Sequence, residues 1–335
     1  MTATLRAGRV ALRLEPSAVL LGTAAWAAAA AVALYAVTVG EYPVPLPAVL
    51  DALAGRGTPL TYDIVVRNRL PRALVGLLVG AALGLAGALL QRIARNPLVS
   101  PDVIGVGAGA SAGAVVMIVV VGAGPAAVVA GALTGAAAAA ATVYAVAGGG
   151  PRRLVLVGIG VTALANAAAS FLLTRSDRQA AMQAATWLVG DVAGRSWPDV
   201  LVAATGPALV VPVVLLLARH LRLLELGDDL ARALDGRIGT VRAALVAAAV
   251  GLTALATAAA GPIGFVALVA PQIVRRILGP RPAGLLPAAG VGALIVAGAD
   301  LAARRLFGPD ELPVGVLTAA VGAPVLLYLL VRADR

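Results

Sequence analysis

The chain contains no cysteine, no lysine and a single histidine among its 335 residues. Without cysteine it has no disulfide and no thiolate nucleophile, and one histidine cannot form a metal cluster. A phosphate-binding P-loop needs the lysine of its Gly-Lys-Ser/Thr sequence. We therefore expect no metal site and no cofactor bound by this chain, and we expect any ATP-driven work to use another subunit.

Charged residues are also scarce, at 13% of the chain against about 25% in an ordinary soluble domain. Hydrophobic residues make up 61%, and the mean hydropathy is +0.97. This composition excludes a soluble enzyme, a disordered protein and a coiled coil. Long runs of Ala, Val and Leu instead indicate membrane-spanning helices, and at about 20 residues per crossing the chain has room for about ten of them.

Ten apolar segments can be marked, at about residues 17–39, 70–93, 101–121, 125–147, 154–173, 198–218, 241–260, 265–278, 285–306 and 313–331. The eighth is too short to cross a bilayer, so we expect it to be buried in protein or to line a cavity. Pro101 and Pro271 mark expected helix breaks. Recurring small residues in the second segment predict close helix contacts, at Gly76, Gly80, Gly84 and Gly87.

The arginines orient these segments. The first apolar run is longer than the core of a signal peptide, which has about 7–15 residues. That run is therefore predicted to be the first membrane helix, and residues 1–16 a cytoplasmic arm. With ten crossings, 17 of the 26 arginines fall on the side that holds both termini, which predicts that this side is the cytoplasm. Because the positive charge lies in loops between apolar runs, we expect no nucleic-acid partner.

The longest polar loop on the predicted cytoplasmic side runs from Arg219 to Arg242. Within it, Leu226, Leu230 and Leu234 recur every four residues with charged residues between them, which predicts a short amphipathic helix. Glycines on either side provide natural breaks. Such a helix either lies on the membrane surface or docks into a soluble partner, and the missing P-loop favours an ATPase as that partner.

Three ordered motifs carry a family resemblance. The first consists of Arg69-Leu-Pro-Arg72, the glutamine-ending run 87–91 and residues 95–105, RNPLVSPDVIG. The second motif is residues 261–276, GPIGFVALVAPQIVRR. The third consists of residues 300–304, 311–318 and 322–324. With these motifs the chain resembles, over about residues 17–332, the FecCD-type permeases. Those are membrane subunits of ABC importers for iron–siderophores, haem and vitamin B12.

Two departures from the family pattern stand out. Pro271 is followed by Gln272 in place of the common histidine, and the usual Leu-Gly of the cytoplasmic loop is Leu-Asp at 234–235. The Pro-Gln variant, with Ser-Pro-Asp at 100–102 and the Trp187–Gly190 segment, resembles the second permease of catecholate-siderophore importers. Because those importers pair two different permeases, the resemblance favours a heterodimer over a homodimer.

The resemblance implies an all-α polytopic membrane protein with about ten transmembrane helices, in the ABC type II importer permease fold. It implies one permease domain over residues 17–332 with a cytoplasmic coupling loop at 219–242, in the cytoplasmic (inner) membrane with both termini cytoplasmic. The implied partners are two ABC ATPase subunits, a second permease subunit, an extracytoplasmic substrate-binding protein, a ferric chelate as substrate and the lipid bilayer.

The resemblance also implies roles for particular residues. The residues expected to contact the ATPase are Leu226, Gly227, Asp228, Leu230, Ala231, Leu234 and Arg237. The inner gate of the translocation path is expected at Asn96, Pro97 and Leu98. The substrate-binding protein is expected to dock on Arg69, Arg72 and Arg304, unless these arginines are only interfacial anchors.

Two further expectations concern polar residues within the helices. Asp300 is placed near the outer end of its helix, where Arg304, four residues later, is a plausible partner. Asn166, Ser170 and Thr174 recur every four residues, and they either face the path or hydrogen-bond a neighbouring helix.

The predicted function is therefore ATP-driven import of an iron–siderophore, with no covalent chemistry in this chain. Haem and vitamin B12 remain alternative substrates. A secondary active transporter is the alternative mechanism, but it would carry ionisable groups near the bilayer midplane, and the apolar segments are almost free of acids. A membrane enzyme would need a nucleophile–base pair or a metal site, for which few residues are present.

Overall fold

The computed structural model describes residues 3–7, 10–147, 151–279, 284–306 and 311–333. Within these ranges the chain is a bundle of helices preceded by a short hairpin, in which β1 (Ala3–Ala7) pairs antiparallel with β2 (Val10–Leu14). The hairpin lies in the predicted N-terminal arm. Arg9, Arg281 and Arg335, which contribute to the arginine asymmetry, lie outside the described residues.

Each of the ten predicted apolar segments contains a helix. Among the described residues, seven of these helices include a stretch long and apolar enough to cross a membrane: α1 (Pro16–Thr38), α4 (Leu70–Ala94), α6 (Pro125–Ala147), α7 (Pro151–Arg175), α9 (Trp197–Leu216), α12 (Ile238–Ala260) and α14 (Leu285–Leu306). The other three segments hold α5 (Val106–Val115), extended by the π-helical η3 (Val116–Val121), then α13 (Val266–Leu278) and α15 (Val314–Ala333). The predicted all-α polytopic fold with about ten spans is confirmed.

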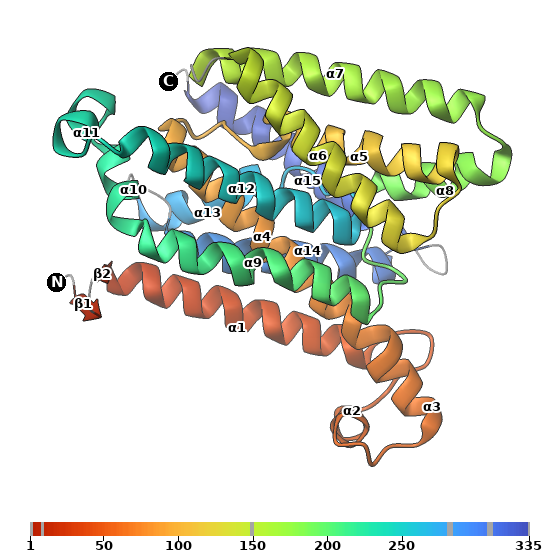
Figure 1. Cartoon of the computed structure of the whole chain (residues 1–335). Helices are drawn as coiled ribbons and strands as arrows, with labels where there is room; N and C mark the ends of the chain where they lie inside the picture. The colour runs from red at the N-terminus through yellow and green to blue at the C-terminus, as the bar shows by residue number, and fades with distance from the viewer. Residues whose placement is uncertain (1–2, 8–9, 148–150, 280–283, 307–310, 334–335) are drawn as a thin grey trace.

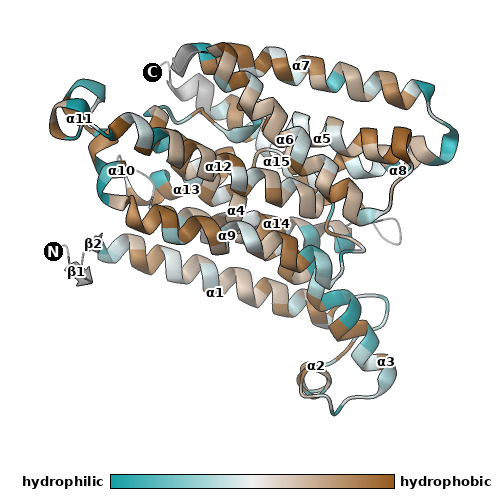
Figure 2. Ribbon diagram, in the orientation of Figure 1, coloured by the Kyte–Doolittle hydropathy of each residue, from teal (hydrophilic) through white to brown (hydrophobic). Residues whose placement is uncertain are grey.

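The connecting elements gather at the two ends of the bundle (Figure 1). At one end lie the β1–β2 hairpin, α10 (Ala218–Glu225), α11 (Asp228–Leu234) and the C-terminal end of α15. At the other end lie α2 (Leu46–Leu53), α3 (Pro59–Tyr62), the π-helical η1 (Asp63–Arg69) that leads into α4, and one end of α8 (Arg178–Val189). Figure 2 shows hydrophilic residues collected at both ends and apolar residues between them.

Helix α4 forms the centre of the bundle, since 83% of its most apolar stretch is buried. Its glycines explain the close packing. A methyl group added at Gly80 or Gly84 would collide with the backbone of α14, and one at Gly87 would collide with the Ala267 carbonyl of α13. Gly76, by contrast, has only an ordinary contact with α14. The small-residue spacing therefore predicted real helix contacts at three of its four positions.

One predicted helix break is in the wrong place. Pro101 does begin a short 3-10 turn, η2 (Pro101–Ile104). Pro271, however, lies inside α13, and the break precedes it at residues 261–265, where Gly261 and Phe265 have positive φ angles of 75° and 67°. A proline is tolerated in a buried helix when neighbours enclose the carbonyl it leaves unbonded. That carbonyl belongs to Ala267, against which α4 packs.

Candidate functional site

A cluster of buried charges joins α4 and α14 at the end of the bundle away from α11. Arg72 Nε donates to Asp300 Oδ1 at 2.8 Å, and Arg72 Nη1 donates to Glu311 Oε2 at 2.7 Å. Arg304 donates to the second oxygen of Asp300. The side chains of Arg72, Arg304 and Asp300 are only 12%, 8% and 4% exposed. The predicted Asp300–Arg304 pair is confirmed, and Arg72 is an additional partner.

Backbone carbonyls at and just after the end of α1 accept hydrogen bonds from Arg69 and Arg304. Arg69 donates to the carbonyls of Val37 at 3.0 Å and Tyr42 at 2.7 Å, and Arg304 donates to Ala36 O at 3.2 Å. The three arginines predicted for docking are therefore brought to one place, but their guanidinium groups already have partners within the chain. Docking of another protein on them stays a prediction.

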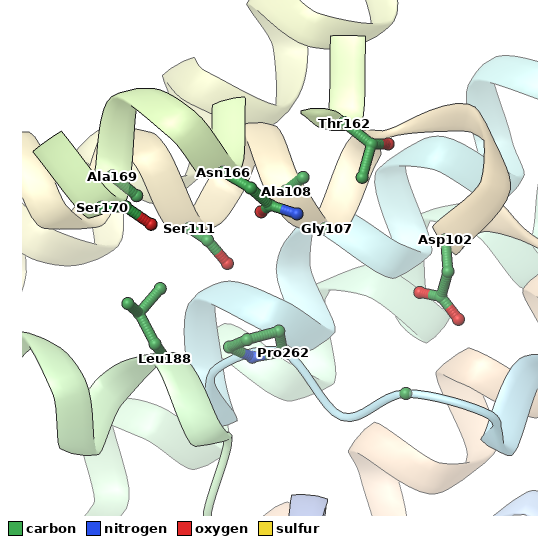
Figure 3. A pocket seen from close by; sticks show the side chains of 11 residues that line it. Asp102, Gly107, Ala108, Ser111, Thr162, Asn166, Ala169, Ser170, Leu188 and Pro262 are labelled. Atoms are coloured by element: carbon green, nitrogen blue, oxygen red, sulfur yellow. The ribbon is translucent and has the colours of Figure 1, made fainter. Parts of the chain in front are cut away.

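A cavity of about 370 Å³ lies among α5, α7, α8 and the loop before α13 (Figure 3). Its polar lining comes from Asp102, Ser111, Thr162, Asn166 and Ser170. The last three lie on α7, where the helical spacing places them along one side. Two residues predicted to face the translocation path, Asn166 and Ser170, thus do line a cavity, although that cavity's role as a path stays a prediction.

Thr174, the third polar residue of the same spacing, is not among the lining residues. Its hydroxyl instead donates to the Phe171 carbonyl of its own helix at 2.8 Å. This bond lies within α7, so it is not the contact with a neighbouring helix that the alternative predicted. A threonine in a membrane helix commonly satisfies its hydroxyl in this way.

The turn after α4 lies at the opposite end of the bundle, near α10 and α11. Arg95 ends the helix in the left-handed conformation, with φ 50°, and Asn96 Oδ1 accepts the Leu98 amide at 2.9 Å. Gln272 of α13 donates to the Pro97 carbonyl at 2.6 Å. This geometry brings Asn96, Pro97 and Leu98 into one compact turn, and their role as an inner gate stays a prediction.

Gln272 forms structural contacts between helices, whereas in the sequence it stood out only as a departure from the family pattern. It is 8% exposed and also donates to Gln91 Oε1 at 3.0 Å, while Gln91 donates to the Leu268 carbonyl at 3.2 Å. The two glutamines thus join α4 to α13. The only signal of this contact in the sequence was the unusual residue after Pro271.

The predicted amphipathic helix is present as α11. Its start is set by Gly227, whose φ of 108° ends the preceding segment. Leu226 therefore lies before the helix and not on it, which corrects the prediction for that residue. Leu226, Leu230 and Leu234 are nevertheless all exposed, at 55%, 58% and 63%.

The other predicted contact residues of this loop divide into buried and exposed ones. Ala231 is fully buried against the bundle, whereas Arg237 is exposed just after the helix. Asp228 is turned inward and forms ion pairs. The helix thus rests on Ala231 and Asp228 and leaves its leucines on the surface.

Comparison with known protein sequences identifies the family to which this fold belongs. Residues 27–332 match the model of the FecCD transport family. The chain is 39% identical over 290 residues to the ferric enterobactin transport system permease protein FepG of Escherichia coli (strain K12), with 86% of this chain and 88% of that protein covered. It is also 39% identical to the cobalamin import system permease protein BtuC of Halobacterium salinarum, with 88% of this chain and 82% of that protein covered.

A solved structure agrees with this assignment. The inward-facing conformation of a transporter described as metal-chelate type superimposes with a TM-score of 0.83 at 28% identity, covering 93% of this chain and 99% of the other. The chain belongs to the FecCD transport family. It is therefore a multi-pass membrane permease, and the family is a transport family and not a catalytic one.

Proposed function

We propose that this chain is the membrane-spanning permease subunit of an ATP-driven importer that carries a ferric chelate of the iron–siderophore class across the cytoplasmic membrane. ATP and magnesium bind to separate ATPase subunits at the α11 end, which faces the cytoplasm together with both termini. An extracytoplasmic substrate-binding protein docks at the opposite end. Residues 17–332 form the single permease domain, and residues 1–16 form the cytoplasmic arm. Residues 219–242 form the loop that couples the permease to the ATPase.

The observation that carries this proposal is the exposure of three leucines around α11. Because the helix stands at a hydrophilic end of the bundle (Figure 2), these side chains are not placed among the apolar residues of the membrane-spanning region. An apolar group of this kind on a polar surface is typical of a protein interface. A soluble ATPase subunit is the partner that an ABC-type permease without a P-loop requires.

The exposed side of α7 supports a second permease subunit. Leu156, Leu164 and Phe171 are exposed at 72%, 72% and 60%, yet Asn166 and Ser170 on the same helix are exposed too. Polar side chains facing lipid are unfavourable, so we expect α7 to border a polar path completed by another subunit. The likeness of residues 100–102 and 271–272 to the second permease of catecholate importers favours a different chain there, and thus a heterodimer.

The substrate class rests on the metal-chelate transporter and the enterobactin permease among the relatives. Sequence identity alone does not decide it, because the cobalamin permease is equally similar at 39%. Vitamin B12 and haem are therefore the competing substrates to be tested.

Uptake by reconstituted complexes tests the proposal. The permease, its partner permease, the ATPase and the binding protein are placed in vesicles, and entry of radioactive ferric siderophore is measured. We expect uptake that requires ATP and continues when ionophores collapse all ion gradients, with little competition from cobalamin or haem. Uptake that follows an ion gradient without ATP would identify a secondary transporter, and preferential entry of cobalamin or haem would replace the substrate class alone.

A further inference from the structure

Asp228, the first residue of α11, joins this helix to two membrane helices. Arg242 of α12 donates to both carboxylate oxygens, from Nη2 to Oδ1 at 2.6 Å and from Nη1 to Oδ2 at 3.0 Å. Arg95, at the end of α4, donates from Nη2 to Oδ1 at 3.3 Å. One carboxylate therefore connects α11 to both α4 and α12.

Asp228 is held as an anion in this position. Its hydrogen bonds from Arg242, together with the charges of Arg242, Arg95 and Arg232, lower the pKa of its carboxyl below the usual value, despite partial burial. The start of a helix also favours a negative charge. The carboxylate thus keeps its charge, and its contacts with both arginines, throughout the physiological pH range.

The Arg95 contact leads directly to the turn after α4. Arg95 is the residue in the left-handed conformation at which α4 ends, and Asn96 to Leu98 follow it. The Pro97 carbonyl is in turn bonded by Gln272 of α13. A continuous series of contacts therefore runs from α11 through Asp228 and Arg95 to the 96–98 turn and the short helix α13.

A second ion pair restrains the same end of α4. Arg92 Nε donates to Glu225 Oε1 of α10 at 2.5 Å, and both side chains are largely buried, at 15% and 22% exposure. Glu225 and Asp228 lie on either side of Gly227, which has a positive φ angle. Helices α10 and α11 are thus both tied to α4 by charges, so a displacement of α11 would act on the last turn of α4 and the residues that follow it.

We propose that Asp228 is a positioning residue that transmits displacement of α11 to the 96–98 turn, through Arg95, and to α12, through Arg242. This inference rests on the proposed function, in which an ATPase moves α11. Partly exposed ion pairs contribute little to stability, and the side chains of Arg95, Asp228 and Arg242 are 48%, 33% and 26% exposed. A purely structural role therefore predicts that neutralising Asp228 has almost no effect.

The adjacent Asp229 provides a matched control, because it is exposed and lies in the same helical turn. Asp228→Asn and Asp229→Asn are compared in the full reconstituted complex. We expect Asp228→Asn to keep ATPase co-purification and ATP hydrolysis within about twofold of wild type and to lower uptake per ATP hydrolysed about tenfold, within the range reported for coupling residues. Asp229→Asn leaves all three unchanged. Equal uptake per ATP in the two variants would overturn the proposal.

A double-substitution cycle tests whether Asp228 acts through Arg95. If it does, Arg95→Gln lowers uptake per ATP, and the Asp228→Asn, Arg95→Gln double variant is no worse than the more impaired single variant. Multiplicative losses would show that the two residues act independently. Release of the ATPase by Asp228→Asn would make Asp228 a docking contact, which overturns the link but keeps the proposed function.

Hydrogen exchange in the purified permease gives a readout that does not depend on transport. Without the Asp228 contact, the turn held by Arg95 should open more often, so exchange of the Leu98 and Val99 amides is expected to rise several-fold in Asp228→Asn and not in Asp229→Asn. Unchanged exchange would count against the link even if the complex proved not to be an importer.

Discussion

The guanidinium of Arg72 and the carboxylate of Asp300, far apart in sequence, meet through Nε and Nη2, each 2.8 Å from Oδ1. Asp228 and Arg95 form the corresponding contact at the other end of α4. The central helix is therefore fixed by an aspartate-centred ion-pair network at both ends. In the proposed importer, the Asp300 network lies at the end where the binding protein docks. The Asp228 network lies at the end where the ATPase is coupled.

Removing the Asp300 carboxylate is expected to destabilise the protein strongly. Asp300→Ala leaves the guanidinium groups of Arg72 and Arg304 buried and without this partner, and breaking a buried pair costs about 3–5 kcal/mol. The exposed pair between Arg67 and Asp63, with side chains 70% and 52% exposed, provides the comparison. Asp63→Ala should cost about 0–1 kcal/mol. Similar unfolding midpoints in detergent for the two variants would show that the Asp300 network is not structural.

Close packing between α4 and α14 is tested at Gly84. A methyl group there would lie 3.0 Å from the Ala288 carbonyl carbon and 3.2 Å from Gly292 Cα, so Gly84→Ala is expected to cost about 1–3 kcal/mol through overpacking. A methyl group added at Gly251 of α12 would instead lie in open space. Gly251→Ala should be neutral or slightly stabilising, because alanine favours a helix by up to about 1 kcal/mol. Thermal unfolding of both variants measures the difference.

The arginine distribution predicts cytoplasmic termini. Reporter fusions after residue 333 and within α8 should report opposite sides of the membrane, with the C-terminal fusion inside. In the structure, the end of α15 lies with α10 and α11, away from α2 and α3 (Figure 1). Fusions that report the same side would contradict the ten-span arrangement.

The docking proposal is best tested at Arg69. Arg72 and Arg304 are engaged by Asp300, so replacing them would disturb folding together with docking. Arg69→Glu should weaken association with the substrate-binding protein about tenfold or more, because charged contacts at a rim act on association rate. High salt should weaken wild-type binding more than that of the variant.

Arg67→Glu, two positions earlier on an exposed side chain, is the control for Arg69→Glu. It changes the net charge equally but removes no predicted docking residue. Equal binding by the two variants in surface-binding kinetics, with unchanged thermal stability, would leave Arg69 as an interfacial anchor.

The leucines around α11 are tested by Leu230→Asp. A buried, unpaired carboxylate in the proposed ATPase contact costs several kcal/mol, so the ATPase should no longer co-purify while the spans stay folded. Leu53→Asp, at a leucine of α2 that is 49% exposed, is the control at the opposite end and should retain the ATPase. Unchanged co-purification in Leu230→Asp would place the ATPase contact elsewhere.

Hydropathy and local spacing predicted much of this structure. Apolar runs predicted the helices because the backbone must satisfy its hydrogen bonds within each span. Glycine spacing indicated the contacts at Gly80, Gly84 and Gly87, and the four-residue spacing of Asp300 and Arg304 indicated their pair, since both signals depend only on positions along one helix.

Contacts between distant segments were decided by the tertiary structure alone. No local pattern places Arg72 beside Asp300, Asp228 beside Arg95 and Arg242, or Gln272 against Pro97, because each depends on how separate helices cross. The break before α13 was mislocated for the same reason: Pro271 is tolerated where another helix encloses the Ala267 carbonyl. The sequence by itself determined the membrane-spanning helices and the family, whereas helix packing decided which of the few charged residues are paired and which surfaces remain for partners.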